Sequence, residues 1–228
     1  MIIRCLASGS SGNCIVLEEN GKLVLLDVGI RLADIKKGIK YRVSDIELFF
    51  CSHKHSDHSL SAGKLEKMGI DGFQPYKCEN QIQTFKKHGW YLRSFPLPHG
   101  EDVKNCGTYI MSPEGHKLLY LVDFQYSAYK FTTLAVDTII IECNHDDIVE
   151  KDENEGHWEH SVRNHSSVST ICEFLRVNKT NNLKTVILAH ASSNNLDVRN
   201  AVFRVKEVVG SDCNVFVAGK GVSIDTDE

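Results

Sequence analysis

Short apolar runs separated by polar or glycine-containing turns dominate the first half of the chain, and this pattern predicts β-strands. Residues 2–8, 14–20 and 22–29 are aliphatic and β-branched, and the Asn20-Gly21 pair between the last two is a strong hairpin signal. Comparable runs predict strands or strand-and-turn segments at 45–52, 90–99, 107–113, 116–123, 136–143, 183–190 and 213–224. The Glu114-Gly115 turn is expected to pair the run at 107–113 with the one at 116–123.

Apolar residues at helical spacing appear in three places. Residues 59–69 combine this spacing with serine near the start and glycine at the end, which are typical helix boundaries. Residues 166–179 and 195–210 predict two further helices, with the strand at 183–190 between them. Strands that alternate with helices indicate an α/β fold whose central strands are covered on both faces.

The segment at about 145–165 breaks this pattern because it is long, polar and acidic. It exceeds the usual length of a tight connection, so we interpret it as a lid or interface loop, with a solvated acidic middle. His145, His157 and His160 within it are expected to be exposed and to ligate nothing.

Composition adds limits to this picture. The chain has 228 residues, of which 42% are apolar and 25% charged, as expected of a globular protein, and we predict one domain over 1–228. The formal net charge is −4, so no global basic field would hold nucleic acid nonspecifically, although a local patch remains possible.

The predicted compartment is the cytoplasm. The start MIIRCLASGSSG has neither the charged beginning nor the apolar run of a secretion signal, and no segment has the apolar length of a membrane span. The eight cysteines form no C-x-x-C pair, so we expect reduced thiols without disulfides.

The stretch CSHKHSDHS at 51–59 crowds His53, His55, Asp57 and His58 into one short turn with almost no apolar residue. Such groups make a poor core but a good metal site if further ligands arrive from elsewhere. Five apolar runs end in His or Asp, namely at Asp27, His53, His99, Asp123 and His190. Packing alone does not explain this repetition, so we expect these side chains to converge at one sheet edge.

The spacing suggests two metal sites. His53 and His55 are two residues apart, so they point the same way from an extended segment and can bind one ion. Asp57 and His58 lie past the bend and can reach a second ion. We expect His99 to complete the first site, His190 the second, and Asp123 to bridge them. Imidazole and carboxylate without thiolate suit Zn²⁺, Mn²⁺ or Fe²⁺, and Zn²⁺ is favoured.

With these motifs in view, HKHSDH resembles the H-x-H-x-D-H signature of the metallo-β-lactamase superfamily, and the other strand ends follow that superfamily's order. The resemblance implies a four-layer αββα sandwich with two divalent metal ions at the edge of its two sheets. It assigns His53, His55, His99 and Asp123 to one ion, and Asp57, His58, Asp123 and His190 to the other. Asp27 matches an aspartate that orients the ligands and does not bind metal.

Three stretches resemble a phosphodiesterase and nuclease branch of that superfamily, with bacterial 5′-exonucleases and ribonuclease Z-type relatives: ASGSSGNC, IIECNHD and RNHSSVST. In that branch a histidine before the last helix contacts the scissile phosphate or shuttles a proton, and His165 matches its position. The branch usually has Gly-His-Leu-Ser, whereas this chain has Asn164-His165-Ser166-Ser167. The candidate catalytic residues are therefore Asp57 and His165.

Two further residues are candidates for substrate binding. Asn144 and Ser166 are expected to line the pocket, although Ser166 and Ser167 are also natural caps for the helix that follows.

The expected reaction is hydrolysis of a phosphodiester bond. Only 67 positions separate Asp123 from His190, which leaves no room for the large inserted domain of the bigger nucleases in this superfamily. Small size and negative charge favour a cyclic mononucleotide, and phage-encoded enzymes of this fold that hydrolyse cyclic nucleotide immune signals are similar in size.

Several alternatives stay open at this stage. An exonuclease or endonuclease acting on DNA or RNA is the main one, followed by a thioester, lactone or β-lactam hydrolase. A binding protein that has lost its chemistry is disfavoured because all seven expected ligands are present. The resemblance also implies a homodimer.

Overall fold

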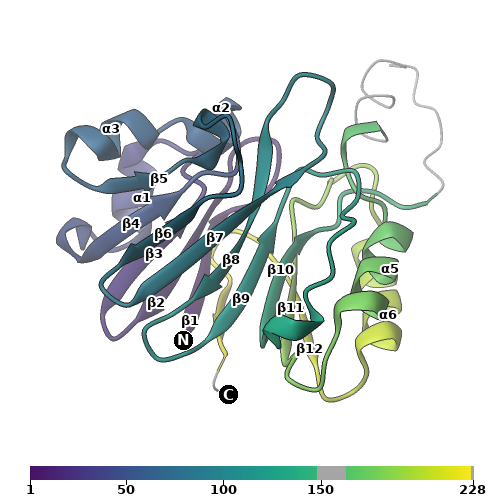
Figure 1. Ribbon diagram of the computed structural model, residues 1–228. Coiled ribbons are helices and arrows are strands. Elements are labelled where there is room, and N and C mark those ends of the chain that lie inside the picture. The colour runs from purple at the N-terminus through teal and green to yellow at the C-terminus, as the bar shows by residue number, and fades with distance from the viewer. Residues whose placement is uncertain (148–162, 227–228) are drawn as a thin grey trace.

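The computed structural model describes residues 1–147 and 163–226, and its strands form two sheets (Figure 1). Sheet A has the order β13-β1-β2-β3-β4-β5. Its strands are β1 Ile2–Ala7, β2 Cys14–Glu19, β3 Lys22–Leu26, β4 Ile46–Phe50, β5 Asp71–Phe73 and β13 Ser223–Asp225. Sheet B has the order β12-β11-β10-β9-β8-β7-β6. Its strands are β6 Thr84–Lys87, β7 Trp90–Leu97, β8 Asn105–Met111, β9 Lys117–Leu121, β10 Thr138–Glu142, β11 Thr185–Ala189 and β12 Asn214–Val217.

Helices cover the outer sides of the two sheets, which gives the expected αββα order of layers (Figure 1). On the side of sheet A lie α1 Leu32–Gly38, α2 Ser56–Ser59 and α3 Ala62–Lys67. On the side of sheet B lie α5 Val168–Asn178 and α6 Val198–Val209. Short 3₁₀ turns occupy Val43–Asp45, Pro75–Lys77 and Thr132–Leu134.

The central strands are buried along their whole length because both of their faces are covered. Every residue of β4, β10 and β11 is buried. One face of each sheet packs against the other sheet, in a core that includes Phe50 and Tyr120. The opposite faces pack under the helices in two separate clusters. This burial explains why the runs read as continuous apolar segments in the sequence.

Strand direction brings the chemically important ends together. β3 is parallel to β4, and β9, β10, β11 and β12 are mutually parallel. β7 is separated from β9 by two antiparallel steps, so it runs in the same direction as β9. The carboxyl ends of these strands therefore lie at one edge of their sheet.

Most of the expected elements are confirmed. Asn20 and Gly21 both have positive φ (49° and 73°), as the predicted hairpin between β2 and β3 requires. β8 and β9 form the expected antiparallel pair.

Other expectations were incomplete. The helix expected at 59–69 is α3, which is shorter, whereas α1, α2, β5 and β6 were not predicted. The final segment is two strands in different sheets, because its glycine-rich turn sends β13 across to pair with β1. Within the described residues, no helix is both long enough and apolar enough to cross a lipid bilayer.

Candidate metal centre

The structure brings the side chains predicted from the strand ends into two clusters at one edge of the sandwich. One cluster contains His53, His55 and His99, and the other contains Asp57, His58, Asp123 and His190. Within each cluster the potential ligand atoms all lie within 4.8 Å of one another. These residues follow β4, β7, β9 and β11 or lie in α2, so segments from distant parts of the chain meet here.

Three of the strand-end residues adopt a left-handed backbone that only glycine favours. Asp27, Asp123 and His190 have φ values of 54°, 51° and 50°. This conformation turns the chain sharply at the end of the strand, and it costs about 1–3 kcal/mol at each position unless neighbours hold it.

Hydrogen bonds from distant segments hold these turns. The Asn105 side chain donates to the carbonyl of Asp123 at 2.5 Å. The N–H of His190 donates to the hydroxyl of Ser8 at 2.8 Å. The N–H of Asp27 donates to the carbonyl of Phe50 at 2.8 Å. The strained turns are thus stabilised by tertiary contacts, which no local sequence pattern reports.

Close backbone packing fixes α2, which carries Asp57 and His58. The N–H of Asn13 donates to the carbonyl of Asp57 at 2.7 Å, and the N–H of Val28 donates to the carbonyl of His58 at 2.8 Å. A Cβ atom at Gly29 would lie 1.5 Å from the carbonyl oxygen of Asp57, so only glycine fits there. The SGSSGN loop therefore has a packing role beside the site, because Asn13 belongs to it.

In the first cluster, the Nδ1 atoms of two histidines face anchoring groups while their Nε2 atoms face the centre. Nδ1 of His53 lies 3.1 Å from the Ser52 hydroxyl, and Nδ1 of His99 donates to the carbonyl of Asn164 at 3.1 Å. Nε2 of His53 lies 2.9 Å from Nδ1 of His55. Such anchoring orients an imidazole for metal binding through its other nitrogen.

In the second cluster, His58 lies against two carboxylates. Its Nε2 atom is 3.2 Å from Oδ2 of Asp123 and 3.3 Å from Oδ2 of Asp57. The same Asp123 oxygen lies 3.8 Å from Nε2 of both His53 and His99. Asp123 therefore stands between the two clusters, as a bridging ligand would.

Asp27 lies behind the second cluster and holds His58 from the other side. Its carboxylate accepts from Nδ1 of His58 at 2.7 Å, from the N–H of Ser52 at 2.7 Å and from the Tyr120 hydroxyl at 2.7 Å. Asp27 is fully buried. This placement agrees with the prediction that Asp27 orients a ligand.

Burial keeps the histidines of the first cluster neutral. Burial lowers the pKa of His53, His55 and His99, and the neighbouring His58 lowers the pKa of His53 further. A histidine must be neutral to bind a metal ion, so these three are already in the ligating form near neutral pH.

The second cluster is more strongly charged. Burial opposes the charged form of His58, but the carboxylates of Asp123 and Asp27 outweigh it and raise the pKa of His58. Burial likewise opposes ionisation of Asp123, but His190 and His58 hold the pKa of Asp123 well below its usual range.

Unsatisfied polar atoms test whether the residues fit a metal ion. Among the described residues, Oδ1 of Asp123 and Nε2 of His190 are buried without a hydrogen-bond partner. Such atoms are costly unless something binds them. Both atoms belong to the second cluster and can each offer a lone pair to a metal ion. The cluster therefore fits a divalent ion that accepts nitrogen and oxygen ligands.

Glu142 is a functional residue that the strand-end pattern should have found. It ends the apolar run of β10 just as Asp123 ends β9, but only His and Asp endings were counted in the sequence. Glu142 is fully buried. Its Oε1 accepts from Nδ1 of His165 at 2.6 Å and from Nδ1 of His190 at 3.1 Å.

His165 lies at the site, beside both clusters. Its ring stacks on that of His190, with 5.2 Å between ring centroids, and lies 5.5 Å from the ring of His99. Burial opposes protonation, but Glu142 outweighs it and raises the pKa of His165 to about 9. The Glu142 carboxylate therefore favours the protonated form of His165 and accepts the hydrogen bond from its Nδ1 atom.

The residues expected to bind substrate have other contacts. The Asn144 side chain donates to the carbonyl of His190 at 2.9 Å and so positions that residue. The Ser166 hydroxyl is buried and donates to the carbonyl of Phe124 at 2.5 Å, while Ser167 caps α5 through Thr170. The NH₂ group of Asn144 and the hydroxyl of Ser166 thus donate to backbone carbonyls, while Oδ1 of Asn144 is buried without a partner among the described residues. Substrate contact by these two residues stays a prediction.

The expectation for the segment at 145–165 needs one correction. His145 is only 4% exposed, because Nδ1 of its ring donates to the carbonyl of Asp146 at 2.7 Å and its backbone bridges to Ser167. The lid or interface loop itself, with His157 and His160, falls mostly on residues 148–162, which lie outside the described residues.

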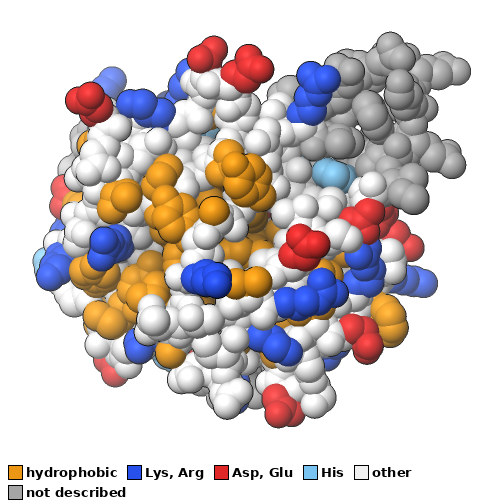
Figure 2. All heavy atoms as spheres, turned by 45° about the vertical axis from the view of Figure 1, so that its right-hand side comes forward, with side chains coloured by type: hydrophobic (Ala, Val, Ile, Leu, Met, Phe, Trp, Pro, Cys, Tyr) orange, Lys and Arg blue, Asp and Glu red, His pale blue; other side chains and the backbone are white. Residues whose placement is uncertain are grey.

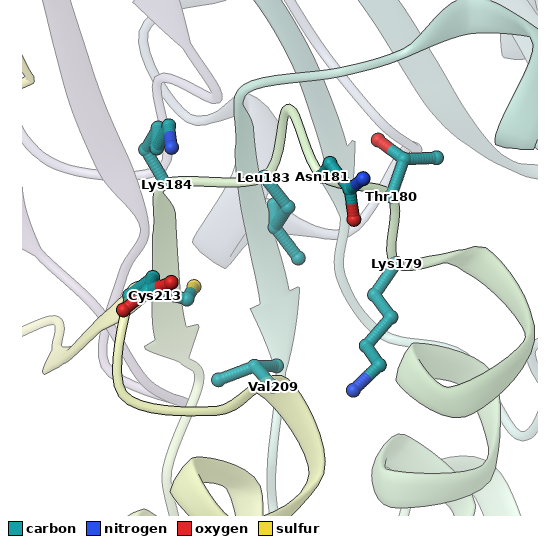
Figure 3. A pocket seen from close by; sticks show the side chains of 8 residues that line it. Lys179, Thr180, Asn181, Leu183, Lys184, Val209 and Cys213 are labelled. Carbon is teal, nitrogen blue, oxygen red and sulfur yellow. The ribbon is translucent and has the colours of Figure 1, made fainter.

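A shallow pocket lies away from this site (Figure 3). Lys179, Lys184 and Cys213 are among the residues that line it. It adjoins the start of β11, whereas His190 follows the end of that strand. None of the clustered histidines or carboxylates contributes to it.

The cysteines agree with the predicted reduced state. All eight are free thiols, seven of them buried, and Cys78 is exposed.

Comparison with known proteins agrees with this fold. Residues 7–71 match the family model described as the metallo-beta-lactamase superfamily. The chain is 26% identical over 165 residues to the exodeoxyribonuclease WalJ of Streptococcus pneumoniae, a match that covers 62% of this chain and 61% of that protein. The aligned region thus spans less than two thirds of that relative.

Solved structures share nearly the whole fold. The metallo-beta-lactamase fold protein YhfI from Bacillus subtilis has a TM-score of 0.72 at 16% identity, with 98% of each chain covered. The short form of human tRNase Z has a TM-score of 0.63 at 15% identity, with 99% of each chain covered. A diphosphatase of the PhnP family has a TM-score of 0.62 at 14% identity, covering 98% of this chain and 97% of that one.

The αββα fold, the match at residues 7–71 and the HKHSDH motif at the sheet edge thus make this chain similar to proteins of the metallo-β-lactamase superfamily.

Proposed function

We propose that this protein is a metal-dependent phosphodiesterase that holds two divalent ions, with Zn²⁺ favoured. The observation that carries the proposal is the position of His165, which donates to Glu142 and stacks on His190 beside two adjoining clusters of metal-type ligands. His53, His55 and His99 would hold one ion, Asp57, His58 and His190 the other, and Asp123 would contact both. Bound ions would supply Lewis acidity toward a phosphoryl group and lower the pKa of water in the site.

His165 is the residue suited to the leaving group. Glu142 raises the pKa of His165 to about 9, and the His165 ring lies 5.5 Å from the ring of His99 and 5.2 Å from that of His190, measured between centroids. It can therefore neutralise charge that builds on the phosphoryl oxygens and donate a proton to the departing oxygen. Glu142 makes this possible by accepting the Nδ1 proton of His165, which directs reactivity to Nε2.

Asp57 is better suited to binding a metal ion than to accepting a proton. Burial opposes its ionisation, but its contact with His58 outweighs this and lowers the pKa of Asp57. A carboxylate with a lowered pKa is a weak base at neutral pH. We therefore assign Asp57 to the catalytic centre as a ligand.

Two substrate classes compete within this proposal. Small size and net negative charge favour a cyclic mononucleotide, as the sequence indicated. The similarity to an exodeoxyribonuclease favours the end of a nucleic acid strand. We give the second class more weight, because size and charge are generic properties whereas that similarity extends over 165 aligned residues.

A substrate panel tests the proposal. Metal-loaded protein is incubated with cyclic CMP, cyclic UMP, cyclic AMP, 5′-phosphorylated single-stranded DNA, bis-p-nitrophenyl phosphate, a thioester, a lactone and a β-lactam. We expect hydrolysis of phosphodiesters alone, and its loss in a chelator. Turnover that survives chelation, or that is confined to the thioester, lactone or β-lactam, would contradict the proposal.

Matched histidine variants locate the chemistry. His165→Ala should reduce turnover about 100-fold or more, because general acid catalysis typically contributes that much. His88→Ala is the control, because His88 is exposed and contacts Glu47 away from the clusters. The predicted homodimer is checked separately by light scattering of the purified protein.

A further inference from the structure

Among the described residues, no helix covers the outer side of sheet B over β6 to β9, the strands farthest from α5 and α6 (Figure 1). Residues directly opposite each other in antiparallel strands point to the same side of a sheet. The register therefore puts Lys86, Tyr91, Met111 and Lys117 in one row across β6, β7, β8 and β9. The next row contains Thr84, Arg93, Tyr109 and Leu119. We refer to these eight residues as the β6–β9 face.

This face is partly uncovered. Lys86, Thr84 and Arg93 are exposed, and Tyr91, Met111 and Lys117 are partly exposed. The helices α5 and α6 lie toward the other end of the sheet, beside β10, β11 and β12 (Figure 1). In the space-filling view, hydrophobic side chains gather near the middle of the visible surface with Lys and Arg side chains beside them (Figure 2).

The cations of this face have no acidic partner in the described part of the chain. No ion pair there involves the side chains of Lys86, Arg93 or Lys117. The ammonium of Lys86 lies 5.4 Å from the centre of the Tyr91 ring. The nearby Asp137 accepts from the backbone N–H of Lys117, not from its ammonium. The face therefore combines positive charge with aromatic rings.

An aromatic path connects this face to the metal centre. β7 runs from Tyr91 towards His99. The six residue steps from Tyr91 to the end of the strand at Leu97 span about 20 Å. The exposed ring of Tyr129 is tilted against that of the buried Phe95 of this strand, with 5.4 Å between ring centroids. The loop that carries Tyr129 begins beside the end of β7, where the N–H of Gln125 donates to the carbonyl of Pro98 at 3.0 Å.

Tyr126 belongs to the same loop as Tyr129, the loop that follows β9. It follows Gln125 directly and lies three residues after Asp123. Its side chain is 57% exposed, although it is a large aromatic residue. Exposed aromatic rings beside unpaired cations are the features by which proteins hold single strands, because every base can stack and every phosphate is charged.

We propose that the β6–β9 face and Tyr126 form a binding track for single-stranded nucleic acid that leads into the metal centre. The inference rests on the nucleic-acid form of the proposed function. A second copy of this chain is a poorer occupant, because two such faces would bring Lys86, Arg93 and Lys117 against like charges. A polyanion matches these charges, and its bases match the rings.

Oligonucleotide binding tests the track separately from hydrolysis. Metal-loaded protein is titrated against a labelled single strand of about 12 nucleotides with phosphorothioate linkages, which resist cleavage, and fluorescence anisotropy is recorded at several salt concentrations. We expect the double variant Lys86→Glu/Arg93→Glu to weaken binding about tenfold or more and to reduce the salt dependence. Tyr126→Ala should weaken binding about fivefold or more, through lost base stacking.

The control carries the same charge change elsewhere. Lys64→Glu/Lys67→Glu alters two exposed lysines of α3, on the other side of the sandwich, and should leave binding unchanged. Hydrolysis of bis-p-nitrophenyl phosphate should be the same in all these variants, which shows that the metal centre is intact. Wild-type protein that does not bind the strand overturns the track. The track is also overturned if the two double variants lose equal affinity for the strand. It is likewise overturned if the protein is a dimer and only Lys86→Glu/Arg93→Glu dissociates it, because the face would then be a dimer interface. If wild-type protein does not hydrolyse bis-p-nitrophenyl phosphate, the proposed phosphodiesterase function itself is overturned.

Discussion

Tyr120→Phe removes one oxygen atom from the contact that joins the two sheets behind the metal centre. Tyr120 belongs to β9 in sheet B, and its hydroxyl donates at 2.7 Å to Asp27, which follows β3 in sheet A. Burial raises the pKa of Tyr120, and Asp27 raises it further, so the hydroxyl remains a donor at all ordinary pH values. The ring stays in place in the variant, so the substitution tests the hydrogen bond alone.

The magnitude follows from the burial of both partners. A hydrogen bond to a charged group contributes about 1.5–3 kcal/mol net, and both side chains are at most 1% exposed. Asp27 keeps its bonds from His58 and Ser52 in the variant, so we expect a loss in the lower part of this range, about 2 kcal/mol. In a protein of this size that loss lowers the Tm by about 4–8 °C.

The assay is urea unfolding of metal-free protein, followed by calorimetry. Tyr109→Phe is the matched control, because Tyr109 is also buried in sheet B and no hydrogen bond of its hydroxyl is found among the described residues. Metal affinity is measured by competition with a chelating dye, and it should fall severalfold in Tyr120→Phe because Asp27 orients His58. An unfolding free energy for Tyr120→Phe within about 0.5 kcal/mol of wild type would refute the reasoning.

Three further predictions concern charge and metal. Glu142→Gln removes the carboxylate that raises the pKa of His165 to about 9, so the pKa of His165 should fall towards its ordinary value near 6.5. The alkaline limb of the pH–rate profile should then move down by about two pH units. A limb that does not move would exclude His165 as the titrating acid. Burial opposes ionisation of Asp147, but its hydrogen bonds with Arg204 and Ser169 lower the pKa of Asp147 to about 2. The ionised carboxylate therefore stabilises the folded state at pH values above 3.8, its usual pKa, and this stability is lost as the pH falls through about 2. Asp147→Asn should therefore lower the Tm at pH 7 by more than at pH 3, and an equal difference at both pH values would contradict this. Removal of metal with a chelator should lower the Tm, because an ion present at about 100 times its Kd stabilises the fold by about 2.7 kcal/mol, and a Tm that is unchanged by chelator would argue against the site.

The candidate metal ligands could be predicted from the sequence because most of them are His or Asp residues at the ends of apolar runs. Asp27, His99 and Asp123 could be singled out by this rule alone, and the structure brings them to one edge. The same rule applied to glutamate would have found Glu142. Periodicity is a property of neighbours along the chain, so strand ends can be identified without knowing where they meet in space.

Sequence reasoning was weaker where a residue's role depends on its contacts. Asn144 and Ser166 have the polarity of substrate-binding residues, yet both donate to backbone carbonyls next to the site. His145 lies in a polar stretch, yet it is buried. Contacts with residues distant in the chain decide these roles, namely His190 for Asn144, Phe124 for Ser166 and Ser167 for His145, and no local pattern encodes them.

What the sequence by itself determined is the set of elements and the donor atoms at their ends. Tertiary structure alone decided the rest. It selected the left-handed turns at Asp27, Asp123 and His190 and joined Glu142 to His165. It also left the β6–β9 face without a helix from the described part of the chain. The physical reason is range: hydrophobic periodicity acts between near neighbours, whereas a strained turn, a buried ion pair and an uncovered face exist only because segments distant in the chain pack together.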